Sequence, residues 1–284
     1  MTHVVLAATL TPFKPDGSLW LERITPYLRF LGEHGVDGYL ALGTNGEFAS
    51  LNVAERQDVL TAVIDAADGR RVIANVGSTV ASDTLVLTQH AREVGADSVA
   101  VLPPYYFPIT ARAYDDLVRR VADTFERPVH LYNIPRYTGF VVPIDSVTRL
   151  NDEGIIAGLK DSSQDLDYFG AVQAAAPDIE LLMGSDTTLI AGLEHGANGV
   201  ASGMANTFPD ITVGAVRAFE SGEDMTPWAE KIQRIRTFFA RYPYLAATRH
   251  AISERGLDVG AVRPPLTDLS EDEAQSARDD VAEL

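Results

Sequence analysis

The sequence predicts an α/β protein, a (β/α)8 TIM barrel followed by a C-terminal helical extension. Eight short apolar runs rich in β-branched residues recur along the chain, and helical patterns with apolar residues at i, i+3 and i+4 separate them. The runs are apolar enough to be buried on both faces, as the strands of a parallel sheet are. Eight such strand–helix units in about 220 residues fit a closed barrel better than an open doubly wound sheet.

End signals mark several of the predicted elements. Asn52 and Glu55 have the spacing of a capping box, and Gly35, Gly95 and Gly196 each follow a helical pattern as C′ residues do. The glycines lie in HGVDG, VGADS and HGANG, a repeated joint before the second, fourth and eighth runs. The predicted strands are Val4–Thr9, Gly38–Leu42, Arg71–Val76, Ser98–Leu102, Pro128–Tyr132, Ile155–Lys160, Ile179–Met183 and Gly199–Ser202, and the clearest helical patterns are Ala54–Ala67, Thr84–Val94 and Tyr114–Phe125.

Only helical patterns remain after Asn206. We therefore expect a catalytic barrel over residues 1–222 and a C-terminal helical domain over residues 223–284. The chain ends in the acidic segment SEDEAQSARDDVAEL, which we expect to be exposed.

The composition favours a soluble globular protein and argues against several kinds of partner. A net charge of −17 would repel both nucleic acid and an anionic membrane surface. No apolar run approaches the ~18 residues of a membrane span, and the start MTHVVLAATLTPF lacks the features of a signal peptide, so we expect a cytoplasmic protein. The acidic balance, with three Lys against twenty Arg, fits either a high-salt cytoplasm or a GC-rich genome.

The sequence also argues against a metal site. The chain has no cysteine, which excludes thiolate ligands and disulfides. Its six histidines are scattered and form no HxH or HExxH pair. We therefore expect no bound metal.

The segments that follow the predicted strands are unusually polar. Because the chemistry of (β/α)8 barrels takes place at the C-terminal ends of the strands, these segments are the candidates for a functional site. We expect all of them to face one mouth of the barrel. They are Gly43–Glu47, Pro103–Tyr106, Tyr132–Pro135, Lys160–Ser162 and Gly184–Asp186.

Lys160 ends an apolar strand in the stretch GIIAGLKDSS, whereas Lys14 and Lys231 lie where a solvated ammonium group needs no explanation. Desolvation disfavours the charged form of a lysine, and a free amine attacks carbonyl groups. The imine that results is an electron sink once it is protonated, and it permits C–C bond cleavage or formation without a cofactor. The alternative is that Lys160 pairs with Asp161 or another carboxylate at the rim.

Two hydroxyl groups are expected near this lysine. Tyr132 ends the neighbouring strand, so its phenol can relay protons, although a buried tyrosine bonded to the backbone is the commoner case. Thr44 lies in the glycine-rich GTNG, which either turns backbone N–H groups toward a carboxylate or is a plain tight turn. Tyr105 and Tyr106 follow a double proline and either pack on the surface or supply a hydroxyl across a subunit contact.

Together these motifs resemble the dihydrodipicolinate synthase and N-acetylneuraminate lyase family, the pyruvate-dependent Schiff-base lyases and aldolases. The resemblance covers essentially the whole chain. The matching motifs are TPF at Thr11–Phe13, then GTNGE, PPYY, YNIP, GLKDSS and SGMAN at Ser202–Asn206, in order and at fitting intervals.

The resemblance implies a role for each matching residue. It makes Lys160 the imine-forming lysine and Tyr132 the proton shuttle. It also has Thr44 bridge Tyr132 to Tyr106, which reaches in from a neighbouring subunit of a homotetramer, a dimer of dimers. Thr44 and Asn45 would hold the carboxylate of pyruvate, and the backbone near Ala201 would close that pocket. No cofactor other than the covalent imine is implied.

Departures from the family's patterns indicate which member this chain resembles. Dihydrodipicolinate synthases carry motifs similar to GTTGE and YNxPxRTG. In this chain Asn45 replaces the second threonine of the first motif. Tyr137 stands at the arginine position of the second motif, and Arg136 lies one residue earlier. Asparagine in the loop is more similar to the aldolases and dehydratases of sugar acids such as 2-keto-3-deoxygluconate. Phosphorylated substrates are less favoured, because Phe107–Ile109 supplies no cation, although Arg112 could compensate.

We therefore predict reversible aldol cleavage of a 2-keto-3-deoxy sugar acid to pyruvate and an aldehyde. Ser185, Asp186, Asn206 and Arg136 are the candidate contacts for the distal hydroxyl groups, although Asp186 could instead cap the helix that follows it. The alternatives are 4-hydroxy-tetrahydrodipicolinate synthase using Arg136, a sugar-acid dehydratase of the same family, and a sugar-acid-binding sensor that is no enzyme.

Overall fold

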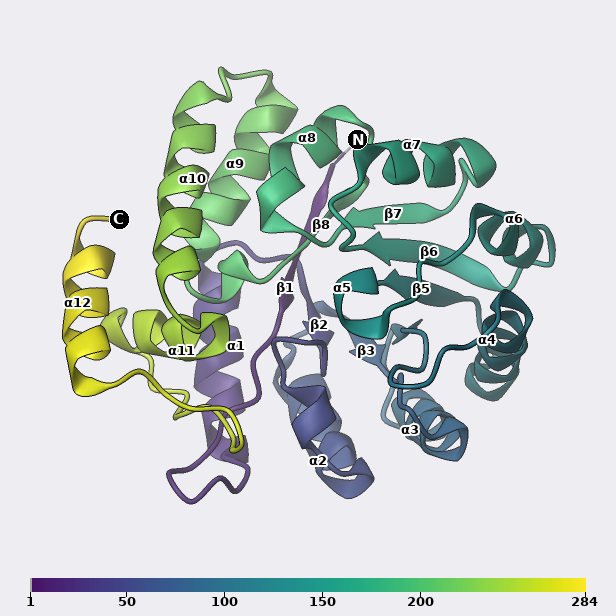
Figure 1. The fold of residues 1–284 in the computed structure, drawn as a ribbon, viewed down its shortest axis with the longest axis horizontal. Helices are drawn as coiled ribbons and strands as arrows, with labels where there is room; N and C mark the ends of the chain where they lie inside the picture. Colours follow the sequence, from purple (N-terminus) through teal and green to yellow (C-terminus); the bar gives the residue numbers. More distant parts are fainter. Residues whose placement is uncertain (1) are drawn as a thin grey trace.

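The structure, a computed structural model, describes residues 2–284. Its centre is a closed barrel of eight parallel strands in sequence order, each paired with two neighbours (Figure 1). This confirms the predicted (β/α)8 architecture, and every predicted strand agrees with the observed one to within a residue at each end. The strands are β1 Val4–Ala8, β2 Gly38–Ala41, β3 Arg71–Asn75, β4 Ser98–Val101, β5 Val129–Asn133, β6 Ile156–Asp161, β7 Glu180–Met183 and β8 Gly199–Ser202.

A helix follows each strand and covers the outside of the barrel, and further helices form the C-terminal extension (Figure 1). Within residues 2–284 every helix is too short or too polar to cross a bilayer. The α-helices are α1 Ile24–Glu33, α2 Val53–Ala66, α3 Ala81–Glu93, α4 Ala111–Phe125, α5 Pro135–Thr138, α6 Ile144–Asp152, α7 Leu166–Ala175, α8 Leu189–Glu194, α9 Pro209–Ser221, α10 Thr226–Arg241, α11 Tyr244–Glu254 and α12 Glu271–Ala282, and the 3-10 helices are η1 Leu21–Arg23, η2 Phe48–Ser50, η3 Asp186–Thr188 and η4 Met204–Asn206.

The predicted end signals are present. Asn52 and Glu55 form a capping box at the start of α2. Gly35, Gly95 and Gly196 have φ angles of 84°, 87° and 85°, the left-handed conformation that a C′ residue adopts at low cost when it is glycine. The repeated joint therefore ends a helix and starts a strand in the same way three times.

The pairing of β5 with β6 contains a bulge. Val129 pairs with Ile156, but the next residue, His130, pairs with Gly158, so β6 has one extra residue, Ala157. A shift of one residue turns every following side chain to the other face of a strand. The bulge brings Lys160 into register with Tyr132.

A charged cluster lies at the opposite, N-terminal end of the barrel, where β3, β5 and β7 face one another. Arg71 donates two hydrogen bonds to Glu180, at 2.6 and 2.7 Å, and His130 lies 2.8 Å from the same carboxylate. Gly158 leaves room for the His130 ring, because a Cβ there would come within 2.5 Å of it. Burial raises the pKa of Glu180, but the hydrogen bonds with His130 and Arg71 outweigh it and lower that pKa to about 2.

The C-terminal helices lie together on one side of the barrel, next to α9 and α1 (Figure 1). Helix α9 ends at Ser221, and helix α10 packs against helix α9. Phe238 of α10 and Ile252 of α11 belong to the same apolar core as the barrel strands. The division into two domains at residue 222 stays a prediction.

The cluster around Glu180 predicts how stability depends on pH. Because the pKa of Glu180 is lowered in the folded protein, the carboxylate stabilises the fold above about pH 4.5, and this contribution is lost as the pH falls toward 2. We expect Glu180→Gln to lower the melting temperature at pH 7 by roughly 5–10 °C. Thermal melts of this variant should depend less steeply on pH below about pH 5 than those of the wild-type protein. The exposed Glu22, changed to Gln, is the control, and parallel curves for wild type and Glu180→Gln would contradict the assignment.

Candidate active site

The C-terminal ends of the strands form the floor of a cavity of about 860 Å³. Residues after β2, β5, β6, β7 and β8 line it, and α10, α11 and the loop 262–267 complete its wall. Four of the five predicted strand-end segments therefore share one mouth. The fifth, Pro103–Tyr106 after β4, lies outside this lining in the single chain.

Lys160 lies at the floor of the cavity and is 3% exposed. Its Nζ donates a hydrogen bond to the hydroxyl of Tyr132 at 3.2 Å and makes no ion pair with any residue in the described range 2–284. Asp161 is turned away, because its carboxylate accepts hydrogen bonds from Asn133 at 2.7 Å and Ser163 at 2.8 Å. The alternative of a Lys160–Asp161 ion pair is therefore wrong.

Tyr132 connects Lys160 to the loop after β2. Its hydroxyl lies 3.3 Å from Oγ1 of Thr44 as well as 3.2 Å from Nζ of Lys160. Tyr132 is 2% exposed, and its hydroxyl contacts side chains, unlike a tyrosine that only satisfies the backbone. Thr44, Tyr132 and Lys160 thus form a continuous hydrogen-bonded row from a barrel loop to a buried amine.

Asp186 is a half-buried carboxylate in the cavity wall. It accepts hydrogen bonds from the hydroxyl of Ser202 and from the backbone N–H of Met204, the latter at 2.8 Å. Burial raises the pKa of this carboxyl group. The predicted alternative, that Asp186 caps a helix, is wrong, because Ser185 is the N-cap of η3 and accepts from the N–H of Thr187.

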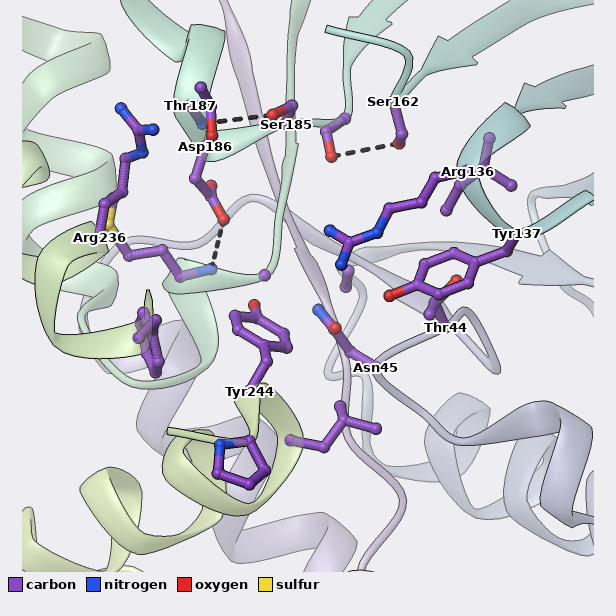
Figure 2. A pocket seen from close by; sticks show the side chains of 18 of the residues that line it. Thr44, Asn45, Arg136, Tyr137, Ser162, Ser185, Asp186, Thr187, Arg236 and Tyr244 are labelled. Carbon is purple, nitrogen blue, oxygen red and sulfur yellow. Dashed lines mark hydrogen bonds between the residues drawn. The ribbon is translucent and has the colours of Figure 1, made fainter. Parts of the chain in front are cut away.

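The side walls of the cavity carry residues that the sequence predicted and residues that it did not. Figure 2 shows Arg136 and Tyr137 approaching from the β5 side and Arg236 and Tyr244 from the C-terminal helices. Arg136 was predicted as a contact, and it does line the cavity. Arg236 and Tyr244 were missed, because they lie on α10 and α11, where no strand-end motif marks them.

Gly203 allows two polar groups to meet above β8. A Cβ on Gly203 would lie 2.3 Å from the hydroxyl of Tyr244 and 2.6 Å from Nδ2 of Asn45. The Tyr244 side chain as a whole is 37% exposed, but desolvation of its hydroxyl and the neighbouring Asp186 carboxylate raise the pKa of that hydroxyl. The small residue therefore lets α11 and the loop after β2 approach each other at the edge of the cavity.

The remaining predicted site residues fall into two groups. Ser185 and Ala201 line the cavity, and Ala201 is 1% exposed. Asn206 does not line it: its amide donates to the carbonyls of Ala8 and Gly203, and its oxygen accepts from Tyr27. We therefore do not keep Asn206 among the proposed substrate contacts.

Tyr106 lies away from the cavity of its own chain. Its side chain is 87% exposed, and its φ angle is 87°. Within residues 2–284 the Tyr106 hydroxyl makes no hydrogen bond to Thr44 or Tyr132, so the predicted bridge needs a second subunit.

Comparison with known proteins agrees with the geometry of this site. The family model described as "Dihydrodipicolinate synthetase family" matches residues 1–284. The chain belongs to this family. One similar solved structure is YagE from Escherichia coli K12 in complex with pyruvate, with a TM-score of 0.93, 27% identity, and coverage of 100% of this chain and 98% of YagE.

The curated members that resemble the chain are described as lyases, synthases and aldolases. An uncharacterized DapA-like lyase of Halobacterium salinarum is 36% identical over 99% of this chain and 94% of the relative. A 4-hydroxy-tetrahydrodipicolinate synthase of Methanothrix thermoacetophila is 32% identical, covering 98% and 96%. The probable 2-dehydro-3-deoxy-D-pentonate aldolase YjhH of Escherichia coli is 30% identical, covering 94% and 92%. These relatives therefore support a lyase or aldolase of the dihydrodipicolinate synthetase family. Their names point to different substrates, so the substrate has to be inferred from the residues that line the cavity.

The contact at Gly203 can be tested by adding one methyl group. Gly203→Ala should displace the Tyr244 hydroxyl or the Asn45 amide and lower the melting temperature by roughly 3–10 °C. Gly170→Ala is the matched control, since Gly170 lies inside α7 and a Cβ added there would have no neighbouring atom within 4 Å. This change should leave the melting temperature unchanged or raise it. Equal melting temperatures for both variants would contradict this prediction, because they would mean that Tyr244 and Asn45 move aside from the added methyl group without loss of stability.

Proposed function

We propose that this protein is a pyruvate-dependent, Schiff-base-forming lyase that reversibly cleaves a 2-keto-3-deoxy sugar acid to pyruvate and an aldehyde. The observation that carries the proposal is the amine of Lys160. It is buried at the floor of an open cavity, lies outside any ion pair in the described chain, and has the Tyr132 hydroxyl as its hydrogen-bond partner. A buried basic group without a counterion costs stability, so its retention favours a chemical role.

The row Thr44–Tyr132–Lys160 suits the steps of an aldol cleavage. Lys160 attacks the C2 carbonyl of the sugar acid, and the hydroxyl group of the resulting carbinolamine takes the proton of Tyr132 and leaves as water, which gives a protonated imine beside the Tyr132 phenolate. Tyr132 accepts the proton of the C4 hydroxyl as the C3–C4 bond breaks, and the bonding electrons pass into the protonated imine. The aldehyde leaves, the resulting enamine takes up a proton at C3, and water hydrolyses the imine to release pyruvate and the free amine.

The loop after β2 is the proposed site of the substrate carboxylate. Thr44 and Asn45 line the cavity beside the row, and the backbone near Ala201 closes it from β8. The structural similarity to YagE in complex with pyruvate supports a pyruvate group in this position. No cofactor is required by this chemistry.

The cavity walls favour a polyhydroxylated distal portion of the substrate. Asp186 and Ser185 offer oxygen atoms to hydroxyl groups, and Tyr244 adds a phenol on the same side. The similarity to the pentonate aldolase YjhH supports a sugar acid. One observation favours 4-hydroxy-tetrahydrodipicolinate synthase as a second candidate, because Arg136 reaches the cavity and could bind the carboxylate of aspartate semialdehyde (Figure 2).

We further propose that Tyr106 completes the site of a neighbouring subunit in a homotetramer. A tyrosine that is 87% exposed beside Phe107, itself 75% exposed, fits a subunit contact better than a solvated surface. The role of this hydroxyl would be to extend the Thr44–Tyr132 row across that contact.

Borohydride reduction in the presence of pyruvate tests the imine. We expect the intact mass of the wild-type protein to rise by one reduced pyruvyl group and peptide mapping to place it on Lys160. Lys160→Ala should show no adduct and no turnover, whereas Lys14→Ala and Lys231→Ala should keep both. An adduct on either of those two lysines, or none in folded wild-type protein, would refute the Schiff-base assignment.

A panel of aldehydes with pyruvate tests the substrate class. We expect a higher kcat/KM with glyceraldehyde than with aspartate semialdehyde, by at least about tenfold, because the walls around Asp186 present hydroxyl-binding groups. Arg136→Gln should change the rate with aspartate semialdehyde more than the rate with glyceraldehyde. The reverse preference would favour the synthase, and release of a 2-keto acid without an aldehyde would favour a dehydratase.

A further inference from the structure

A buried ion pair joins the loop after β2 to the C-terminal helix α11. Oε1 of Glu47 accepts hydrogen bonds from Nε and Nη2 of Arg249, the first at 3.1 Å, and the two side chains are 1% and 2% exposed. Arg249 also donates to the carbonyls of Thr11 and Val259, and Oε2 of Glu47 accepts from the N–H of Arg263 at 3.0 Å. Both charged groups are therefore hydrogen-bonded on several sides, which is the condition for a buried pair to hold a defined geometry.

The loop that this pair holds has strained ends. Leu42 and Glu47 flank the segment Gly43–Gly46, and their φ angles are 58° and 52°, in the left-handed region that residues other than glycine seldom adopt. Such conformations persist where the surroundings enforce them. Asn75 enforces the first end by donating to the carbonyl of Leu42 at 2.7 Å, and the ion pair enforces the second.

The same helix reaches the loop at a second point. Tyr244 begins α11, and its hydroxyl meets the amide of Asn45 above Gly203. α11 therefore contacts the loop on both sides of Gly46, through Tyr244 at Asn45 and through Arg249 at Glu47. Thr44, whose hydroxyl must stay within reach of Tyr132, lies in the loop between these anchored ends.

We propose that Glu47 and Arg249 are positioning residues, whose ion pair holds Thr44 against Tyr132 and Asn45 toward the substrate carboxylate. The C-terminal helix thereby sets the geometry of the reaction centre in its own barrel. This inference rests on the proposed function, because it uses the roles given there to Thr44 and Asn45. An ion pair that only stabilised the fold would affect the melting temperature and leave the kinetics of the folded enzyme unchanged.

The test compares the same substitution in two Glu–Arg pairs at opposite ends of the barrel. Glu47→Gln keeps the size of the side chain but removes its charge. The amide has one oxygen acceptor, so it cannot accept hydrogen bonds from both Arg249 and the Arg263 N–H as the two carboxylate oxygens do. Well below the melting temperature, we expect KM for pyruvate to rise and kcat to fall, with a loss in kcat/KM of about 10- to 100-fold, because small displacements near the reacting atoms have effects of that size. Borohydride should still trap pyruvate on Lys160 when pyruvate is saturating.

Glu180→Gln is the matched control, since Glu180 pairs with Arg71 at the far end of the barrel. It should lower the melting temperature and keep kcat/KM within about twofold of the wild-type value. If Glu47→Gln melts at a lower temperature but keeps wild-type kcat and KM, the pair is structural and the inference is wrong.

Two further outcomes are decisive. Should Glu47→Gln fail to fold, Arg249→Lys takes its place, since it keeps the charge without the two-pronged geometry, and wild-type kinetics in that variant would overturn the inference. Should wild-type protein form no imine with pyruvate, the proposed function fails, and the inference falls with it. Trapping in wild type together with unchanged kinetics in the variants would reject the inference alone.

Discussion

The proposed reaction centre depends on the register of β5 against β6. The extra residue Ala157 shifts the pairing so that Tyr132 and Lys160 lie side by side. If the pairing continued from Val129 and Ile156 without this shift, Tyr132 would pair with Leu159. Lys160 would then turn away from the barrel interior, because neighbouring strand residues face opposite sides. The contact between the Lys160 amine and the Tyr132 hydroxyl therefore follows from one backbone irregularity, and the closed barrel leaves the two strands no freedom to slip.

The division of labour between arginine and lysine fits this arrangement. The ion pairs found in residues 2–284 are made by arginine or histidine, with no lysine among them. Arginine offers several N–H donors to a carboxylate: Arg71 donates to both oxygens of Glu180, and Arg249 donates twice to Oε1 of Glu47. Lysine carries a compact amine that reacts only when it is free. A chain with three lysines keeps one of them buried and outside every such pair, at the floor of its cavity.

Much of the fold and the centre of the site could be predicted from the sequence, because both are encoded locally. Each strand is centred on an apolar run, Tyr132 and Lys160 lie near the ends of two such strands, and Thr44 follows a third closely. The bulge at Ala157 leaves no such signal, since the run around it is equally apolar on both faces. Arg236 and Tyr244 come from the far end of the chain, and their place depends on tertiary packing. Asn206 lies in a matching motif, but its amide holds β1 to η4.

The cavity is thus built from two parts with separate tasks. The barrel supplies the amine, the phenol and the loop that suit a pyruvate group, and these come from strand ends whose geometry the closed sheet fixes. The far wall is supplied by α10, α11 and the loop 262–267, whose cavity-lining side chains, such as Arg236, can differ while Arg249 still anchors α11 to the loop after β2. Such a division accounts for a family in which similar barrels carry synthase and aldolase descriptions. For the proposed aldol cleavage, residues of this wall such as Arg236 and Tyr244 are then the ones expected to select the aldehyde, and they lie far in sequence from Lys160.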